Sequence, residues 1–451
     1  MNFSFTNFKN KQNTNIHFVG IGGISMSALA KYCLLNGFKV SGSDKNLSSI
    51  TEELSSLGAK IYKGHSFSNV IFADVVVYTS AVDSFNPEID YALKHNIMLV
   101  SRAEFLGEII KGAKFSVGVS GSHGKTTATA MITDVLTKSG LNPTAFIGGQ
   151  HLEYGNFKSG SKNCIVAEAC EYKKNFLHLK SSVPVVLNVD DDHLDSYGNM
   201  EEMEKAFSEF IKGYISVINA DDKRALKISD ILSVTFAIKN SATFTAKEIR
   251  KIGEGYSFNA YKCNKKLGRI NLKVKGKHNI YNALAALAVG DISGVLFKDV
   301  KQALESFKGV KRRNEKIGKV YSLNAVCDYA HHPKEILAFT DKKVKNQITV
   351  FQPHTYSRTE KLIDSFVESL SGQSCVIIYK TYPAREKYSY SGSAKILYKK
   401  LKKARNKNTF YRSTVRGLKG LLKKLNSSYT DVYFLGAGDI YDVATEKLVN
   451  K

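Results

Sequence analysis

The 451-residue chain lacks the features that mark secreted and membrane proteins. Its six cysteines are dispersed without a Cys-x-x-Cys pair, which argues against a zinc ribbon or a disulfide framework and fits a reducing compartment. No window reaches the ~18 uninterrupted apolar residues of a membrane span. The N-terminus also lacks the apolar segment of a signal peptide. We therefore expect a cytoplasmic protein that does not insert into membranes.

The chain also has few acidic residues relative to its basic ones. The chain has 41 Asp and Glu against 65 Lys and Arg, which gives a formal net charge of +24. Such a charge can indicate nucleic acid, a membrane surface or anionic small molecules as partners. The lysines are scattered, however, with no continuous basic arm and no aromatic–basic repeat. This favours a solvated, lysine-rich surface that attracts anionic nucleotides, and we expect no nucleic-acid partner.

No internal repeat or low-complexity linker divides the chain, yet short apolar runs alternate with helical patterns throughout. This alternation predicts an α/β fold with parallel sheets. The length fits roughly three domains of ~150 residues, which we place at 1–112, 113–312 and 313–451. In the first third we expect strands at Ile16–Val19, Lys39–Ser41, Ile61–Tyr62, Val75–Thr79 and Met98–Val100, and helices at Ser25–Asn36, Ile50–Leu57 and Ile89–Lys94.

The remaining two thirds continue the pattern. The expected strands are Phe115–Val119, Cys164–Glu168, Val183–Val189, Ile215–Asn219, Leu323–Asp328, Ile348–Phe351, Cys375–Tyr379 and Val432–Leu435. Helices are expected at Asn279–Val289 and from Pro333 and Thr359. The segments Phe236–Ile249 and Tyr256–Val274 alternate more strictly between apolar and polar residues, which predicts an inserted antiparallel patch.

A first glycine loop follows the expected strand Ile16–Val19 and leads into a helix. Its Gly20, Gly22 and Ser25 give the pattern Gly-x-Gly-x-x-Ser, so the third glycine of a dinucleotide fingerprint is absent. Asp44 lies at the end of the next strand, where such folds place an acid on a ribose hydroxyl. The loop alone leaves three interpretations open: a plain strand–helix turn, a nicotinamide or flavin site, or another diphosphate ligand.

A second glycine loop, Gly118–Thr127, is more specific. Lys125 would place its charge between the β- and γ-phosphates of a nucleoside triphosphate, and the Thr126 hydroxyl would bind Mg²⁺. The spacing departs from the strict Walker pattern, because Val119 stands six residues before Lys125. Gly-Lys-Thr-Thr at the start of a helix nevertheless predicts a triphosphate site. The residues expected to line it are Gly121, Ser122, His123, Gly124, Lys125, Thr126 and Thr127.

A metal site is expected beside this loop. Glu168 ends a predicted strand, and His193 lies among the acids of residues 190–195. Together with Thr126 these side chains suggest a Mg²⁺ site, and a histidine ligand would equally admit Mn²⁺. Taken singly, each residue could be an ordinary surface acid or a structural histidine.

Paired asparagines and paired arginines form two further candidate sites. Asn279 and Asn282 are three residues apart, so they share one helix face and could read an adenine edge. Simple capping by Asn279 is the alternative. Arg312 and Arg313 lie at the expected domain junction and could clamp phosphate or form a solvated turn.

Histidines cluster after two expected strands of the last third. His331 and His332 follow Asp328, and His354 and Arg358 follow the strand that ends at Phe351. The carboxyl ends of parallel strands meet at one sheet edge, so these side chains should converge there. Histidines in apolar surroundings are as often structural as catalytic, but their convergence with an arginine favours a site.

These motifs together resemble the Mur ligase family from end to end. The order is far more specific than any single match. The segments that carry the resemblance are Gly20–Ser27, Gly121–Thr127, Glu168–Tyr172, Asp192–Tyr197, His278–Ala283, Val310–Arg313, Asp328–Pro333, Phe351–Thr359 and Leu435–Ile440.

The resemblance implies a three-domain architecture, with a Rossmann-like N-terminal domain, a P-loop ATP-binding central domain and a Rossmann-like C-terminal domain. It also implies an ATP-dependent ligase of peptidoglycan precursor synthesis that joins L-alanine to the lactyl carboxylate of UDP-N-acetylmuramate through an acyl phosphate. A peptide-recycling ligase of the family is the alternative. A nicotinamide-dependent dehydrogenase or a nucleic-acid-binding NTPase is the alternative from a different class. We expect a monomer or weak dimer.

The resemblance also assigns roles to residues. Catalytic roles, including those in the ATP and metal sites, fall to Lys125, Glu168, His193, Asn279, Asn282, Arg313 and Asp328, with Thr126 as a further metal ligand. The UDP-sugar, rather than NAD, would be bound by Gly20, Gly22, Gly23, Met26, Ser27 and Asp44. The amino acid and the acyl phosphate would be bound by His331, His332, His354 and Arg358.

Overall fold

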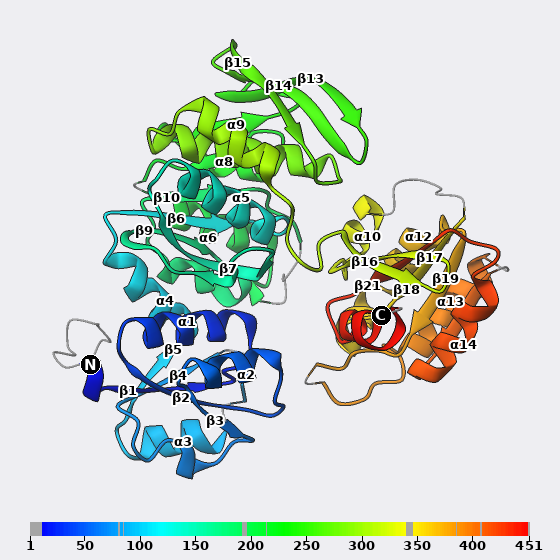
Figure 1. Cartoon of the computed structure of the whole chain (residues 1–451), viewed down its shortest axis with the longest axis horizontal. Coiled ribbons are helices and arrows are strands. Elements are labelled where there is room, and N and C mark those ends of the chain that lie inside the picture. Colours follow the sequence, from blue (N-terminus) through cyan, green and yellow to red (C-terminus); the bar gives the residue numbers. More distant parts are fainter. Residues whose placement is uncertain are drawn as a thin grey trace. The chain divides into compact units, whose positions relative to one another are not determined.

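The computed structural model describes residues 11–79, 82–83, 85–191, 196–212, 214–339, 346–384, 386–405 and 408–449 (Figure 1). The chain divides into two compact units, Met1–Gly309 and Val310–Lys451. Among the described residues, the first unit holds a five-stranded sheet and a ten-stranded sheet, and the second a six-stranded sheet. We call these the first, central and C-terminal sheets. The predicted α/β class is confirmed, and the three domain ranges stay a prediction.

The first sheet is parallel and has the order β3-β2-β1-β4-β5. Its strands are β1 (Asn15–Val19), β2 (Lys39–Asp44), β3 (Lys60–Lys63), β4 (Val75–Tyr78) and β5 (Met98–Ser101), and its helices are α1 (Ile24–Leu35), α2 (Ser49–Ser56), α3 (Pro87–Lys94) and α4 (Arg102–Lys111), with a short turn η3 (Phe67–Asn69). Figure 1 shows α1 and α3 on opposite faces of the sheet. The expected strands and helices of this region are confirmed within one or two residues, except that β2 ends at Asp44, three residues after the expected Ser41.

The position of β1 explains where a ligand can bind. The chain places β2 and β3 on one side of β1 and β4 and β5 on the other. Open α/β sheets bind ligands beyond the carboxyl ends of their strands, at the point where the strand order reverses in this way. The first glycine loop, between β1 and α1, lies at this switch point.

The central sheet has the order β15-β14-β13-β12-β11-β10-β6-β9-β7-β8. Its strands are β6 (Phe115–Ser120), β7 (Pro143–His151), β8 (Gly155–Lys158), β9 (Ser161–Glu168), β10 (Val183–Val186), β11 (Val217–Asn219), β12 (Val234–Ala237), β13 (Phe244–Ile252), β14 (Gly255–Lys262) and β15 (Lys265–Leu272). The accompanying helices are α5 (Lys125–Lys138), η4 (Tyr172–His178), α6 (Met200–Ile211), α7 (Lys223–Ile228), α8 (His278–Ile292) and α9 (Phe297–Ser306).

The expected antiparallel patch is present as β13, β14 and β15, drawn in green at one end of the sheet in Figure 1. The segment Phe236–Ile249 spans the end of β12, which ends at Ala237, and most of β13, which begins at Phe244. The carboxylate of Asp221 accepts the backbone N–H groups of residues 238–240, at 2.7, 2.8 and 2.8 Å, and turns the chain there. The antiparallel pair β7–β8 was not expected.

Three neighbouring strands bring the chemistry of the central sheet together. β6 lies between β10 and β9, and all three run parallel. Their carboxyl ends therefore meet at one edge, as they do in other parallel sheets. The second glycine loop follows β6, Glu168 ends β9, and Asn188 comes shortly after β10.

A shared apolar core and buried polar contacts join the first and central sheets into one unit. Phe18 and Met26 of the first sheet region belong to the same buried cluster as Phe146 and Phe157 of β7 and β8. Tyr32 of α1 packs against both phenylalanines, with ring centroids 5.7 and 6.4 Å apart. Fully burying one such aromatic side chain contributes about 1.5–3 kcal/mol. The two sheets are thus fastened along α1.

The C-terminal sheet has the order β16-β17-β21-β18-β19-β20, parallel except for the β16–β17 pair. Its strands are β16 (Glu315–Val320), β17 (Leu323–Asp328), β18 (Gln347–Phe351), β19 (Cys375–Tyr379), β20 (Thr409–Arg412) and β21 (Asp431–Leu435). Its helices are α10 (Pro333–Phe339), α11 (Tyr356–Lys361), α12 (Ile363–Ser371), α13 (Ala394–Arg405), α14 (Val415–Leu425), α15 (Ile440–Asp442) and the π-helix η6 (Val443–Leu448). The helix expected from Thr359 starts earlier, at Tyr356.

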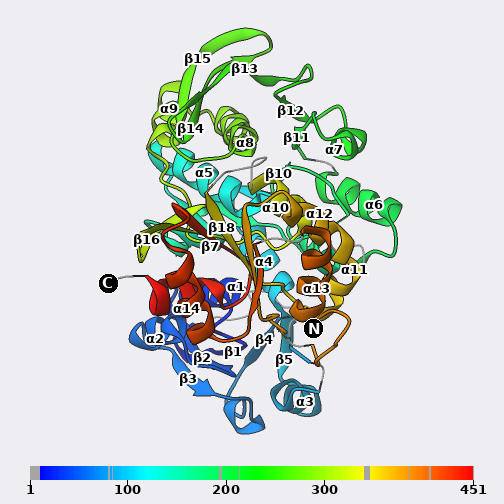
Figure 2. The same ribbon diagram turned by 90° about the vertical axis from the view of Figure 1, so that its right-hand side faces the viewer.

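Two apolar cores cover the two faces of this sheet. Along β19, Cys375 and Ile377 face a core with α14, whereas Val376 and Ile378 face a core with α12 and α13. Strand side chains alternate between faces, so an unbroken apolar strand buries both. Figure 2 shows α12 and α13 on one side of the sheet and α14 on the other. Within the described part of the chain, no helix has the length and apolar character needed to cross a membrane.

Candidate active site

Two glycines give the second glycine loop its shape. Gly121 has φ 134° and Gly124, the residue before α5, has φ 85°, a region that only glycine enters at no steric cost. A Cβ atom at Gly121 would also lie 3.1 Å from the backbone nitrogen of Asn188. Because the loop approaches the neighbouring segment this closely, its glycines are structural requirements.

Asn188 holds the loop from the side. Its Oδ1 accepts the backbone N–H of His123 at 2.8 Å, and its Nδ2 donates to the His123 carbonyl at 3.0 Å. The backbone of Ser122 donates to the Asn188 carbonyl at 3.2 Å. The loop conformation is therefore fixed before any ligand binds. Sequence reasoning missed Asn188 because it extended the expected strand to Val189, whereas β10 ends at Val186. An asparagine in that apolar run was the available signal.

Lys125 is a buried cation between the loop and an acid. Its Nζ donates to Glu171 Oε1 at 3.0 Å and to the Gly121 carbonyl at 2.6 Å. Burial alone would lower the pKa of Lys125, but the nearby Glu171 carboxylate raises it above its ordinary value. The ammonium group therefore stays charged at neutral pH, and it lies at the loop where phosphate oxygens are expected.

Thr126 and Glu168 meet in front of α5. The Thr126 hydroxyl donates to Glu168 Oε2 at 2.9 Å, and the backbone N–H of Gly148 donates to the same oxygen at 3.1 Å. A hydroxyl and a carboxylate are the hard oxygen ligands that Mg²⁺ prefers, so the pair fits a magnesium ion. His193, the third residue of the predicted metal site, lies outside the described residues.

Asn279 and Asn282 lie at the start of α8, behind the loop. Asn282 Nδ2 donates to Asn279 Oδ1 at 2.9 Å, and Asn279 Nδ2 donates to the Lys275 carbonyl at 2.7 Å. A Cβ atom at Gly124 would lie 3.0 Å from Asn282 Oδ1, so this amide faces the loop. The capping interpretation fails, because α8 begins at His278 with Lys277 as its N-cap. A role in adenine recognition stays a prediction.

The first glycine loop uses most of its own amides internally. The N–H groups of Gly20 and of the next residue, Ile21, donate to the Ser43 carbonyl at 2.8 and 3.0 Å. The N–H of Gly22 donates to Asp44 Oδ2 at 3.0 Å. The amides left for a diphosphate are the opening ones of α1, because the first N–H groups of a helix have no partner inside it. The N–H of Ser27 is already used, since it donates to the Gly23 carbonyl at 2.8 Å. Met26 and Ser27, which lie in the first turn of α1, are both buried.

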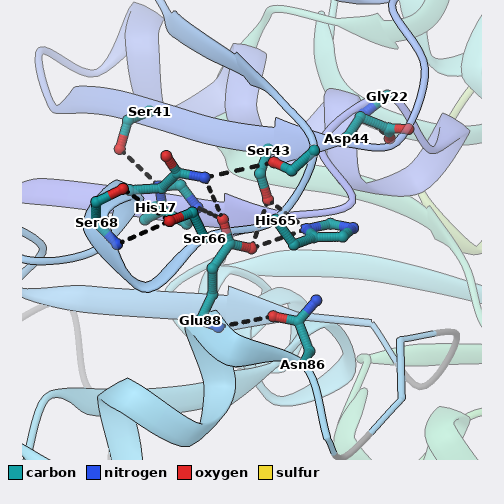
Figure 3. Close-up of polar contacts among 12 residues, drawn as sticks. His17, Gly22, Ser41, Ser43, Asp44, His65, Ser66, Ser68, Asn86 and Glu88 are labelled. Atoms are coloured by element: carbon teal, nitrogen blue, oxygen red, sulfur yellow. Dashed lines mark hydrogen bonds and ion pairs between the residues drawn. The ribbon is translucent and has the colours of Figure 1, made fainter.

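A buried polar network of side chains from β1, β2 and the start of α3 lies next to this loop (Figure 3). Glu88 has no exposed side-chain surface, and its Oε2 accepts hydrogen bonds from Ser43 Oγ at 2.6 Å and from the His65 ring at 2.9 Å. His17 Nε2 lies 3.6 Å from the other carboxylate oxygen. Burial alone would raise the pKa of Glu88, but its contacts with His17, Ser43 and Asn69 lower it to about 2.

This network anchors Ser43, whose carbonyl holds the loop amides. Buried polar groups are tolerated where each finds a partner, and a satisfied network stiffens its surroundings. Sequence reasoning missed it. The available signal was the polar side chains of His17, Ser41 and Ser43 within otherwise apolar strands.

In the second unit, Asp328 ends β17 as expected. Its carboxylate accepts the backbone N–H groups of Asn314 at 2.7 Å and Ala330 at 2.8 Å. Burial raises the pKa of Asp328 to about 6, against the opposing effect of Arg313. The guanidinium of Arg313 lies 5.0 Å from the ring centre of Tyr329. Asp328 and Arg313 therefore belong to one cluster.

Arg312 differs from its neighbour. Its φ is 61°, its Nη2 donates to the Gly438 carbonyl at 2.7 Å, and its guanidinium lies between the rings of Tyr329 and Tyr441, at 5.2 and 5.1 Å. These contacts hold Arg312 in the fold of the second unit. Arg313 is the arginine whose charge acts on Asp328.

The structure brings His331 and His354 together at the same sheet edge. Their rings meet edge to face, with centroids 5.8 Å apart. Burial first, and then the positive fields of His331 and Arg358, lower the pKa of His354 to about 3. His354 is thus neutral at physiological pH. His332 is buried, and its backbone N–H donates to Glu335 at 3.2 Å near the start of α10.

Arg358 is held close to His354 by a strained residue. Thr355 has φ 65°, and its hydroxyl accepts the backbone N–H of Arg358 at 3.4 Å as the N-cap of α11. Glu386 accepts the N–H groups of Tyr356 and Ser357 at 2.6 and 2.9 Å. Strained, capped turns at sheet edges are typical of binding sites.

The fold and the site define an α/β protein in which a phosphate-binding loop with lysine, threonine and glutamate accompanies a separate glycine loop. Residues 15–114 match the family model described as "Mur ligase family, catalytic domain", and residues 119–290 match "Mur ligase middle domain". The chain belongs to the Mur ligase family, which confirms the resemblance drawn from its motifs.

Relatives that match over nearly their full length carry names from the same family. The chain is 41% identical to a UDP-N-acetylmuramate–L-alanine ligase of Clostridium acetobutylicum, over 96% of this chain and 97% of the relative. It is 42% identical to an enzyme of the same name from Acetivibrio thermocellus, over 97% and 96%.

Solved structures are similar over nearly the whole chain. The UDP-N-acetylmuramate–alanine ligase of Thermotoga maritima gives a TM-score of 0.82 at 31% identity, covering 95% of this chain and 97% of that one. A murein peptide ligase from Psychrobacter arcticus gives a TM-score of 0.72 at 22% identity, covering 97% and 100%. The second likeness concerns the fold alone. The expected three-domain Mur ligase architecture is confirmed.

Proposed function

We propose that this protein is an ATP-dependent ligase that joins L-alanine to the lactyl carboxylate of UDP-N-acetylmuramate, in peptidoglycan precursor synthesis. The observation that carries the proposal is the cluster of Lys125, Thr126 and Glu168, in a chain 41% identical over 96% of its length to an enzyme of that name. We further propose that it acts in the cytoplasm as a monomer or weak dimer, without nucleic acid.

ATP binds at the second glycine loop. Lys125 neutralises the β- and γ-phosphates, and the first amides of α5 donate to phosphate oxygens. A magnesium ion held by Thr126 and Glu168, with His193 as a predicted further ligand, would neutralise the charge that develops during phosphoryl transfer. In this assignment Asn279 and Asn282 support the loop, and Arg313 and Asp328 contribute from the second unit.

The sugar nucleotide binds at the first glycine loop. The N-terminus of α1 receives the diphosphate, because its amides are the ones left without partners. Asp44 is placed for the ribose hydroxyls, as in other sheets of this order. The lactyl carboxylate then extends toward the ATP loop, which belongs to the same compact unit.

The reaction has two steps. A lactyl carboxylate oxygen attacks the γ-phosphorus, the bond to the β-phosphate oxygen breaks, and ADP leaves. The amino group of L-alanine then attacks the acyl carbon, the carbon–oxygen bond to phosphate breaks, and the amine loses a proton. His331, His354 and Arg358 are proposed to bind the alanine carboxylate and the acyl phosphate, with His332 supporting them. Excluding water protects the acyl phosphate from hydrolysis.

Phosphate release from ATP tests the assignment. We expect release only when UDP-N-acetylmuramate and L-alanine are both present with Mg²⁺, and loss when any one of them is omitted. UDP-N-acetylglucosamine, which lacks the lactyl carboxylate, should give none. Release with the tripeptide L-alanyl-γ-D-glutamyl-meso-diaminopimelate but not with L-alanine would identify the recycling ligase instead.

A further inference from the structure

A cavity within the first unit lies between the first turn of α1 and Glu168, the acid that contacts the second glycine loop. It is lined by the start of α1, the start of α4, the end of β7 and the end of β9. Its lining residues are Ser25, Ala28, Leu29, Arg102, Leu106, Phe146, Ile147, Gly148 and Glu168. One wall is thus the first turn of α1, and another is the carboxylate that contacts Thr126. The cavity therefore lies beside the first turn of α1 and beside the carboxylate that contacts the second glycine loop.

Arg102 is the cation in this lining, and it belongs to neither glycine loop. It is partly buried and is the first residue of α4, where Ser101 and Glu104 cap each other. Within the described part of the chain, the guanidinium of Arg102 forms no hydrogen bond and no ion pair. A partly desolvated guanidinium without a counter-ion is unfavourable in a protein, and an anionic ligand would relieve it.

Glu168 shares the cavity but does not neutralise Arg102. Its Oε2 is already committed to the Thr126 hydroxyl and to the Gly148 amide, on the side of the ATP loop. A Cβ atom at Gly148 would lie 2.1 Å from this oxygen, so β7 holds the carboxylate closely. Glu168 is therefore held by Thr126 and Gly148, whereas Arg102 lines the same cavity without a contact to this carboxylate.

We infer that Arg102 binds an oxyanion of the sugar nucleotide, either its lactyl carboxylate or its diphosphate. This rests on the proposed function. The planar guanidinium can hold either group by two parallel hydrogen bonds, which a lysine cannot reproduce. The cavity reaches both the α1 turn, where the diphosphate is expected, and Glu168, where the carboxylate is expected. Arg102 is thus a substrate-binding residue in addition to the glycine loops.

Calorimetric titration with two sugar nucleotides tests the inference. UDP-N-acetylmuramate carries both oxyanions, whereas UDP-N-acetylglucosamine carries only the diphosphate. For Arg102→Gln we expect affinity for UDP-N-acetylmuramate to fall about tenfold or more, as losing a charge-assisted pair of hydrogen bonds implies. An equal loss with both ligands assigns the diphosphate. A loss confined to UDP-N-acetylmuramate assigns the carboxylate.

Three controls separate the possible failures. Lys111→Gln removes an exposed cation of the same helix, 74% exposed, and should change neither affinity. Arg102→Lys keeps the charge and should bind more tightly than Arg102→Gln but less tightly than the native chain. ATP binding and the unfolding temperature report whether the variants fold. Unchanged affinity of Arg102→Gln for both sugar nucleotides overturns the inference. Absence of binding by the native chain overturns the proposed function instead.

Discussion

The Thr126 hydroxyl donates a hydrogen bond to Oε2 of Glu168 across 2.9 Å, from the first turn of α5 to the end of β9. The two residues are 42 positions apart in the sequence, and they meet because β6, which leads into α5, pairs with β9. The pair supplies two hard oxygen atoms beside the Lys125 ammonium. The assignment of ATP and magnesium to this edge follows from that arrangement.

Glu168→Gln should raise the magnesium requirement. The amide keeps the shape of the side chain and can still accept from Thr126, but it loses the charge that attracts the cation. We expect kcat at low Mg²⁺ to fall by about 100-fold, with partial recovery at high Mg²⁺ or Mn²⁺. The measurement is phosphate release against metal concentration. Identical metal curves for the variant and the native chain would remove Glu168 from the metal site.

Gly148→Ala should impair catalysis through Glu168. The new Cβ atom would lie 2.1 Å from Glu168 Oε2, so the carboxylate has to move away from Thr126. Displacing a positioned catalytic group by about 1 Å can reduce the rate about 100-fold. Gly420→Ala is the matched control, since a Cβ there meets nothing within 4 Å. Equal activity of the two variants would contradict the close packing around Glu168.

Lys125→Ala should abolish ligase activity while leaving the fold intact. Loss of the ammonium group removes the positive charge that neutralises the transferring phosphoryl group. We therefore expect at least about a 1,000-fold fall in kcat/KM. Removing Lys125 also takes away the cation that contacts the buried Glu171, so some loss of stability should accompany it. Lys138→Ala, an exposed lysine at the other end of α5, serves as the control. Retained ligase activity in Lys125→Ala would refute the ATP assignment.

Asp328 should make stability fall as pH rises through a defined window. Its pKa is raised from 3.8 to about 6 in the folded chain. Between these values the folded state holds a proton that the unfolded state has lost, so the free energy of unfolding decreases with rising pH. Asp328→Asn removes this contribution. The free energy of unfolding of the native chain minus that of the variant should therefore decline from about pH 4 to about pH 6.5. A difference that stays constant across the window would contradict the raised pKa.

Much of the fold could be predicted from local pattern. β19 was expected at Cys375–Tyr379 and lies there, because its five buried apolar residues have no other place to pack. The second glycine loop was recognised because its chemistry is local in sequence, and Lys125 and Thr126 lie where that motif places them. Glu168 was expected nearby because it ends an apolar strand.

The residues that escaped prediction depend on distant partners. Glu88 is buried only because His17, Ser43 and His65 from other strands and loops surround it (Figure 3). Asn156 of β8 is fully buried, and its Nδ2 finds a distant partner in the Ile24 carbonyl at the start of α1, at 2.6 Å. Arg102 begins a helix that was not expected. Sequence periodicity describes one element at a time, so contacts of this kind stay invisible to it.

Isotope transfer tests the central claim most directly. When the lactyl carboxylate of UDP-N-acetylmuramate is labelled with ¹⁸O, the proposed mechanism leaves one carboxylate oxygen on the departing phosphate. Mass spectrometry of the phosphate released with ATP and L-alanine should therefore find one ¹⁸O atom per turnover. Phosphate without label, formed alongside the amide product, would show that no acyl phosphate lies on the path.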